Sequence, residues 1–186
     1  WTATSFNQPI GTWNVSGVSK MESMFREASS FNQDIGAWDT STVTNIGSMF
    51  LEASSFNQDI SAWNISGITS MRYMFRGASS FNQDIGAWDV SSVTDMYEMF
   101  RSASSFDQDL GAWNVSQVIN MREMFLSVTL STANYDGLLI GWSSLNLQSG
   151  VNFHAGGSQY SSAAADERQY IIDTFSWTIS DGGQVP

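Results

Sequence analysis

Carboxylate and amide side chains recur along this chain at fixed intervals, and they are the groups that could do chemistry. The stretch FNQDIGAW at 31–38 returns with small changes at 56–63, 81–88 and 106–113, and a variant, FNQPIGTW, occupies 6–13. The shared acid forms a column at Asp34, Asp59, Asp84 and Asp109. The shared amide forms a second column at Asn7, Asn32, Asn57 and Asn82, which Asp107 closes.

The Asp column admits three interpretations. Each carboxylate can cap the turn that follows it by accepting backbone N–H groups. The column could instead hold calcium, since carboxylate and amide oxygens are its preferred ligands. The acids could also be solvated surface only. Turn capping is the preferred interpretation, because the first unit carries Pro9 in place of the acid. The Asn column is predicted to form a structural ladder of stacked amides.

Catalysis is not predicted. Two carboxylates about 5 Å apart would match a retaining glycosidase in distance, but a catalytic pair should be singular and asymmetric, and these acids repeat in equivalent settings. His154 is the single histidine and there is no cysteine, which disfavours a transition-metal site. No G-x-S-x-G motif occurs. We therefore expect no enzyme activity and no cofactor.

A third polar column follows each repeated tryptophan and is the preferred binding candidate. On a sheet surface its side chains would form a row of hydrogen-bonding groups suited to a glycan or a polar peptide, although a merely solvated face is the alternative. The column comprises Asn14, Asp39, Asn64, Asp89 and Asn114, with the neighbouring serines Ser16, Ser41, Ser66, Ser91 and Ser116.

These columns arise from a repeat of 25 residues, which five tryptophans mark from Trp13 to Trp113. Residues 6–130 form five units after a lead-in at 1–5. Within a unit, alternation at 88–90 predicts a short strand, and i, i+3, i+4, i+7 spacing at 94–103 predicts a short helix. Thr94, like Ser19, Thr44 and Thr69, would be its N-cap. The Met, Phe and Trp positions are predicted to be core.

One strand and one helix per unit cannot bury their apolar faces alone, so the units must stack. The pattern IxxWxVxxV fills the positions of a leucine-rich repeat. The fold class predicted is therefore an α/β repeat solenoid that is leucine-rich-repeat-like. Parallel short strands would line its concave face, which includes the third polar column, and short helices or turns its convex face.

Residues 131–186 depart from the period and predict a C-terminal capping segment. Helical spacing at 131–145 places Tyr135, Leu138, Leu139 and Trp142 on one face. A strand or turn is expected at 151–156, a second helix through Ala164 and Phe175, and a last strand after it. No matching cap precedes the first unit, so we expect further chain before Trp1.

Composition excludes some partners. Acidic residues outnumber basic ones 18 to 7, and the formal charge is −11. Such a surface repels nucleic-acid backbones and anionic lipid. No apolar stretch approaches the ~20 residues that cross a bilayer.

Units such as WDVSSVTDMYEMFRSASSFDQDLGAW, followed by the closing block LSTANYDGLLIGWSSL, resemble the BspA-like leucine-rich-repeat surface proteins of bacteria. The resemblance implies a secreted or surface-displayed, non-catalytic adhesion module, within a multidomain protein, that binds a protein or glycan on another cell or matrix. A carbohydrate-binding repeat domain and a passive spacer remain alternatives, and ice binding is disfavoured because no regular Thr face exists.

Overall fold

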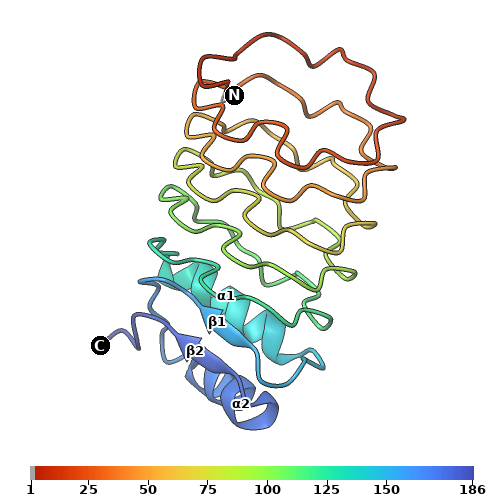
Figure 1. Cartoon of the computed structure of the whole chain (residues 1–186). Helices are drawn as coiled ribbons and strands as arrows, with labels where there is room; N and C mark the ends of the chain where they lie inside the picture. The colour runs from red at the N-terminus through yellow and green to blue at the C-terminus, as the bar shows by residue number, and fades with distance from the viewer. Residues whose placement is uncertain (1–2) are drawn as a thin grey trace.

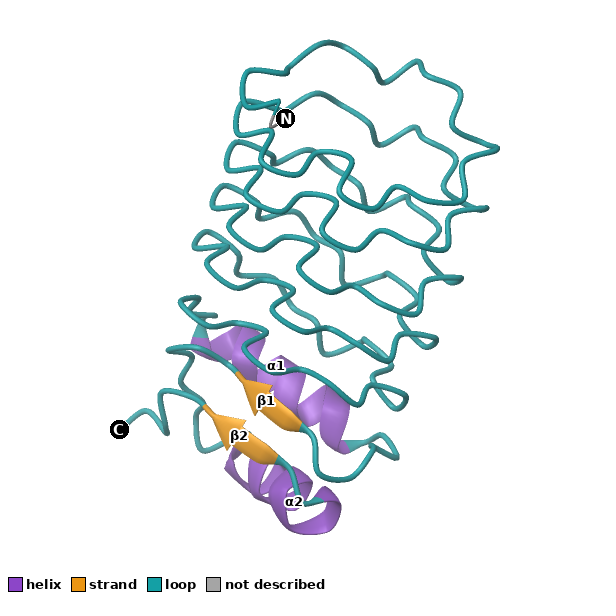
Figure 2. Ribbon diagram, viewed as in Figure 1, coloured by secondary structure: helices purple, strands orange, loops and turns teal. Residues whose placement is uncertain are grey.

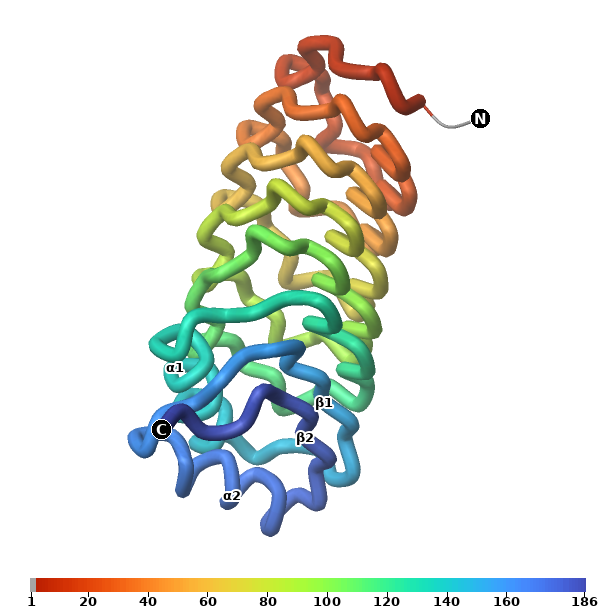
Figure 3. Tube along the Cα trace, turned by 90° about the vertical axis from the view of Figure 1, so that its left-hand side faces the viewer, coloured from red at the N-terminus to blue at the C-terminus, as the bar shows by residue number. Residues whose placement is uncertain are grey.

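The chain winds into a stack of coils that ends in a small helix-and-strand segment (Figures 1 and 3). The computed structural model describes residues 3–186. Coils 1 to 5 are the five sequence units, which begin at Phe6, Phe31, Phe56, Phe81 and Phe106. The regular elements follow these coils, and they are α1 (Thr132–Ser143), β1 (Asn152–His154), α2 (Ala165–Phe175) and β2 (Thr178–Ser180). β1 and β2 pair in parallel as a two-stranded sheet.

The predictions of a strand and of a helix inside each unit are wrong. Residues 3–131 contain no helix and no strand beyond isolated bridges, and Figure 2 draws them as loop throughout. The expected helix at 94–103 is a series of turns, and the expected strand at 88–90 has no strand partner. The N-cap roles predicted for Thr94 and its equivalents therefore do not apply.

Parallel pairing between coils occurs instead along the segment that was predicted to be helical. We call residues 20–28 and their equivalents, 45–53, 70–78, 95–103 and 120–128, the paired segments. Bridges join Lys20 to Asn45, and Ser70 to Asp95 and onward to Asn120. In coil 1, alternate N–H groups of the paired segment donate to carbonyls of coil 2: Met21 to Asn45 (2.8 Å), Ser23 to Gly47 (3.0 Å), Phe25 to Met49 (2.9 Å) and Glu27 to Leu51 (2.6 Å).

The local turns of the paired segments explain why their apolar spacing predicted a helix. The intervening N–H groups close local turns, as when Met24 donates to the Met21 carbonyl (3.2 Å) and Ala28 to the Phe25 carbonyl (3.1 Å). The third residue of these two turns, Ser23 in one and Glu27 in the other, has a positive φ of 58°, which is typical of a type II turn. Consecutive turns bring residues three and four apart to one face, as a helix does, so the apolar spacing is the same.

The core runs the length of the stack as columns of aromatic rings, as the repeated apolar positions predicted. The rings of Phe25, Phe50 and Phe75 stack with centroids 5.6 Å apart. Trp38, Trp63 and Trp88 are each 4% exposed. Each indole nitrogen donates to a carbonyl of the preceding coil, as Trp38 does to Ile10 (3.2 Å). Every coil thus completes the burial of its neighbour.

The C-terminal segment matches its predicted elements. α1 buries Tyr135, Leu138, Leu139 and Trp142, and α2 buries Ile171 and Phe175. Although α1 is helical, it keeps the contact of the coils, because Trp142 Nε1 donates to the Leu110 carbonyl (3.1 Å). β1 likewise continues the paired segments: its residue Phe153 bridges to Met121. The segment therefore packs on coil 5 in the position of a further coil.

Candidate functional site

The Asp column forms turn caps, in agreement with the preferred interpretation. The Oδ1 atoms of Asp34, Asp84 and Asp109 accept the backbone N–H two residues ahead at 2.8–2.9 Å. Asp59 accepts the N–H of Ser61 (2.9 Å), and this backbone bond, with help from the Ser61 side chain, lowers the pKa of the Asp59 carboxyl. One oxygen of each acid is thus engaged within its own turn.

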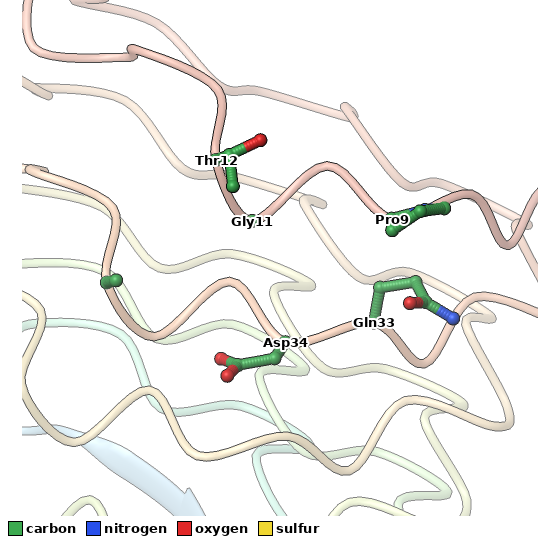
Figure 4. A pocket seen from close by; sticks show the side chains of 6 residues that line it. Pro9, Gly11, Thr12, Gln33 and Asp34 are labelled. Carbon is green, nitrogen blue, oxygen red and sulfur yellow. The ribbon is translucent and has the colours of Figure 1, made fainter.

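Shallow hollows lie beside these turns and repeat with them. One, of about 380 Å³, lies between the turns of coils 1 and 2 and is lined by Pro9, Thr12, Gln33 and Asp34 among others (Figure 4). Another, of about 410 Å³, has equivalent lining between coils 3 and 4, including Asp59 and Asp84. Since the hollow recurs whether the fourth residue of the unit is Pro or Asp, it follows from the stacking of the turns.

The Asn column is the structural ladder that the sequence predicted, with one addition. The Asn57 Oδ1 accepts the backbone N–H of Asn82 and the side-chain amide of Gln83, both at 2.9 Å. The same pair of bonds recurs from coil to coil. The glutamines, which the sequence reasoning left out, are therefore half of the ladder. Asp107 continues the ladder into the C-terminal segment, because its carboxylate accepts a hydrogen bond from the backbone N–H of Ser131 (2.7 Å).

The third polar column, Asn14, Asp39, Asn64, Asp89 and Asn114, is solvent-exposed as predicted, but the strand expected there is absent. Each side chain instead accepts the N–H of the serine two residues ahead, at 3.1–3.2 Å. Hydrogen bonds from the Ser41 and Ser91 side chains, and then from their backbones, lower the pKa of Asp39 and Asp89. The column, with its neighbours Ser41, Ser66 and Ser91, therefore has a demonstrated role in turn formation.

A different surface breaks the repeat. We call the outward side chains of the paired segments the variable face, because corresponding positions differ between coils. One position reads Glu22, Gly47, Arg72, Tyr97, Arg122, and the next reads Ser23, Ser48, Tyr73, Glu98, Glu123. Of the seven basic residues in the chain, six lie in paired segments: Lys20, Arg26, Arg72, Arg76, Arg101 and Arg122. Six acidic residues lie in the same segments, so the paired segments are neutral overall whereas the rest of the chain is strongly acidic.

Arg72 is the centre of a cluster on the variable face of coils 3 and 4. Its guanidinium carbon lies 5.4 Å from the Tyr73 ring centroid and 5.0 Å from that of Tyr97, so it can make cation–π contacts with both. The two rings meet edge to face at 5.3 Å. Arg72 also pairs with Asp95 at 3.2 Å, yet its side chain remains 45% exposed. The cluster is held in place from within and still presents its guanidinium to solvent.

Acidic side chains next to this cluster form ion pairs with two neighbouring arginines, Arg76 and Arg101. The Glu98 Oε2 lies 3.0 Å from Arg76 Nη1 and 3.3 Å from Arg101 Nη1, and Arg101 also pairs with Glu123. The Glu98 side chain is only 5% exposed. A hydrogen bond to Glu98, followed by burial, raises the pKa of the Tyr97 hydroxyl.

A hollow of about 340 Å³ adjoins the cluster. Its lining includes Arg72 and Tyr73 together with the hydroxyls of Thr44, Ser48 and Ser70. The lining runs from Glu22 of coil 1 through Asn45 of coil 2 to the Arg72–Tyr73 pair of coil 3, a pair that occurs in no other coil. An aromatic ring, a cation, a carboxylate and several hydroxyls therefore meet at one place on the surface.

Sequence reasoning missed Arg72, Tyr73 and Tyr97. The search favoured columns that repeat, and the columns prove to be the contacts that shape each coil. The useful signal was the opposite one: exposed positions at which the units differ. Such positions are free of the packing constraint and can serve recognition.

Metal chemistry finds no support in the described residues. Between residues 3 and 186, no group of three or more acidic or histidine side chains is arranged to hold a metal ion. The acids first considered for calcium, Asp34, Asp59, Asp84 and Asp109, are those engaged in turn caps. Over the same residues, no helix is both long and apolar enough to cross a membrane.

Comparison with known protein families gives a family for the array. Residues 1–69 and 59–152 both match the family described as "Mycoplasma protein of unknown function, DUF285". The chain belongs to this family. The two matches together span the coils, α1 and the start of β1, and they leave α2 and β2 outside. Searches of curated proteins and of solved structures found no match.

Proposed function

We propose that this chain is a non-catalytic interaction module that binds a macromolecular ligand through the variable face. The observation that supports this most is the cluster of Arg72, Tyr73 and Tyr97. Tyr and Arg are the residues that most often dominate the energetics of protein interfaces. Here Arg72 is exposed and both tyrosines are partly exposed, and the equivalent positions of the other coils carry different side chains.

The chemistry of the cluster suits an acidic or polyhydroxylated partner. Arg72 offers a planar set of donors, the two tyrosines offer ring faces and hydroxyls, and the adjoining hollow offers further hydroxyls. The remainder of the surface is acidic, with a net charge of −11 for the chain. Repulsion elsewhere would direct a negatively charged partner to this face.

The finer family assignment is part of this proposal. Membership in the matched family, taken with the stacked 25-residue units, supports a relationship to BspA-like surface proteins and a leucine-rich-repeat-like solenoid class. With that relationship, we propose placement outside the cytoplasm, in adhesion to a protein or glycan of another cell or matrix. A carbohydrate-binding role is the second candidate, favoured by the Tyr-lined, hydroxyl-rich hollow. A passive spacer is the third.

Binding assays with two matched variants test the proposal. The chain is screened against immobilised matrix proteins and a glycan array, together with the double variant Arg72→Ala, Tyr97→Ala and the double variant Asp39→Ala, Asp89→Ala. We expect the first variant to lose at least about tenfold in affinity, since two central interface side chains are removed, and the second to bind as the unchanged chain does.

Three results would contradict the proposal in different ways. Loss of binding in the Asp variant alone would move the site to the third polar column. Equal binding by both variants would place the site elsewhere. Absence of any saturable ligand in screens of both kinds would favour the spacer. Circular dichroism of each variant checks that the fold is retained.

A further inference from the structure

The N-terminal end of the stack differs from every internal coil in its exposure. Trp13 is 53% exposed, whereas Trp38, Trp63 and Trp88 are each 4% exposed. Met24 is 40% exposed, and Met49, at the same position in the next coil, is fully buried. The residues are the same in type, so the difference comes from the absence of a neighbour on this side among the described residues.

An apolar hollow of about 220 Å³ marks this end. Its lining consists of Ala3, Phe6, Ile10, Trp13, Met24 and Phe25. In the internal coils the same positions contact the coil before them. Covering these apolar side chains would remove them from water, which is favourable.

The backbone of coil 1 adds a directional signal. In each internal coil, alternate carbonyls of the paired segment accept N–H groups from the coil before, as Gly47 and Met49 do from Ser23 and Phe25. The carbonyls at the equivalent positions of coil 1 receive no hydrogen bond from residues 3–186: Lys20, Glu22, Met24 and Arg26. Along the paired segment this end therefore presents a row of open acceptors, and such edges are templates for pairing.

Residues 3–5 already lie in the register expected for the end of a preceding coil. The Thr4 carbonyl accepts the N–H of Ser30 (3.0 Å), as the Ser29 carbonyl accepts that of Ser55 (3.2 Å). Ser29 Oγ donates to the same Thr4 carbonyl, and Ser54 Oγ to that of Ser29. Ala3–Ser5 thus lie where the last residues of a preceding coil would lie.

We propose that this face is a docking surface for one further coil of the same 25-residue repeat. The incoming coil would supply N–H groups to the four open carbonyls, a corner carbonyl to Trp13 Nε1, and apolar side chains over the hollow. Each contact continues the interface that joins every pair of coils below. A second copy of this chain docked with its paired segment against this one would set open carbonyls against open carbonyls, so this row of acceptors would stay without donors.

An insertion variant tests this surface. A duplicate of residues 31–55, with its own tryptophan replaced by Phe, is placed between Ser5 and Phe6, and a duplicate of scrambled order serves as the control. Fluorotryptophan is incorporated, and the Trp13 resonance is assigned by comparison with Trp13→Phe. We expect the solvent isotope shift of Trp13 to fall to that of the buried tryptophans with the ordered duplicate only, and Tm to rise.

Two outcomes would overturn the proposal. The first is a Trp13 that stays solvent-exposed when the ordered duplicate is present. The second is a concentration-dependent dimer of the unaltered chain, found by sedimentation, in which Trp13 becomes buried, because a second copy would then be the occupant. Since the readout is the environment of Trp13 and not ligand binding, its result is independent of the function proposed above.

Discussion

Two surfaces of the same coils follow opposite rules. The FNQDIGAW corner, meaning residues 31–38 and their equivalents, keeps its residue types in almost every unit and engages them in contacts within the stack. The variable face changes from unit to unit, and the contacts that its side chains make between coils, such as the ion pair of Arg72 with Asp95, occur only at particular coils. Recurrence in this molecule therefore marks the contacts that every coil needs, and departure from recurrence marks positions whose side chains are not required in every coil.

The C-terminal segment supports the same lesson. α1 has neither the sequence nor the backbone of a corner, yet Trp142 makes the indole-to-carbonyl bond and Asn134 donates to Asp107 as a ladder glutamine would. The contacts between adjacent units are therefore retained although the backbone changes from turns to a helix. Stacking contacts, more than local conformation, determine what each unit must supply.

The largest expected effect separates the corner from the variable face. We expect Trp88→Ala to lower the free energy of unfolding by about 3–5 kcal/mol, because it leaves a cavity in the aromatic column. Its indole hydrogen bond to the Ile60 carbonyl (3.2 Å) is lost as well. Tyr97→Ala should cost about 1 kcal/mol or less, as expected of a surface position. Urea denaturation followed by circular dichroism measures both.

Trp13→Ala is the matched control for the tryptophan column. Its ring is 53% exposed, so it should cost far less than Trp88→Ala. Similar losses at Trp88 and Tyr97 would show that the variable face is structural, and the distinction between the two surfaces would fail.

A smaller effect is expected within the amide ladder. Asn57→Ala removes the acceptor of the Asn82 backbone N–H and of the Gln83 amide. Leaving a partly buried donor unpaired should cost about 1–3 kcal/mol. Asn64→Ala is the control, since Asn64 only closes an exposed turn by accepting from Ser66, and it should cost about 0.5 kcal/mol. Equal costs would contradict the ladder as a link between coils.

The smallest expected effect is on the loss of folding stability at acidic pH. Serine hydrogen bonds lower the pKa of Asp39 and Asp89 in the folded chain from the usual 3.8. A lowered folded-state pKa adds stability that is present above the unfolded-state pKa and is lost as pH falls through the folded-state value. We expect Asp39→Asn with Asp89→Asn to lose less stability than the unaltered chain between neutral pH and a pH below the folded-state values.

Urea midpoints at the two pH values measure this loss. Because Asn keeps the acceptor oxygen, the double variant should fold normally at neutral pH. An undiminished acid sensitivity would show that other carboxylates account for it.

Much of the molecule could be predicted from local pattern. The period of 25, the apolar core, the turn caps at Asp34 and its equivalents, and the helices of the C-terminal segment all depend on interactions close in sequence or on burial phase. The secondary structure inside the coils could not be predicted from local pattern. Turns with positive φ at Ser23 and Glu27 place side chains at the same spacing as a helix, and spacing was the signal used.

The candidate site shows the same division. That Tyr73 and Tyr97 are exposed to solvent in part follows from their phase within the unit. That the Arg72 guanidinium lies over both rings depends on coils 3 and 4 being in register, 25 residues apart, and on the rotation of the paired segment relative to solvent. No pattern in a single unit contains that information.

The sequence by itself determined that the chain is a repeat, which residues are buried and which polar groups shape each turn, because burial and turn formation act on side-chain type at each position. The tertiary structure alone decided which backbone segments pair between coils, which face gathers the arginines and tyrosines, and which end of the stack stays open. Those features arise from contacts between residues far apart in the chain, and their geometry exists only once the coils have stacked.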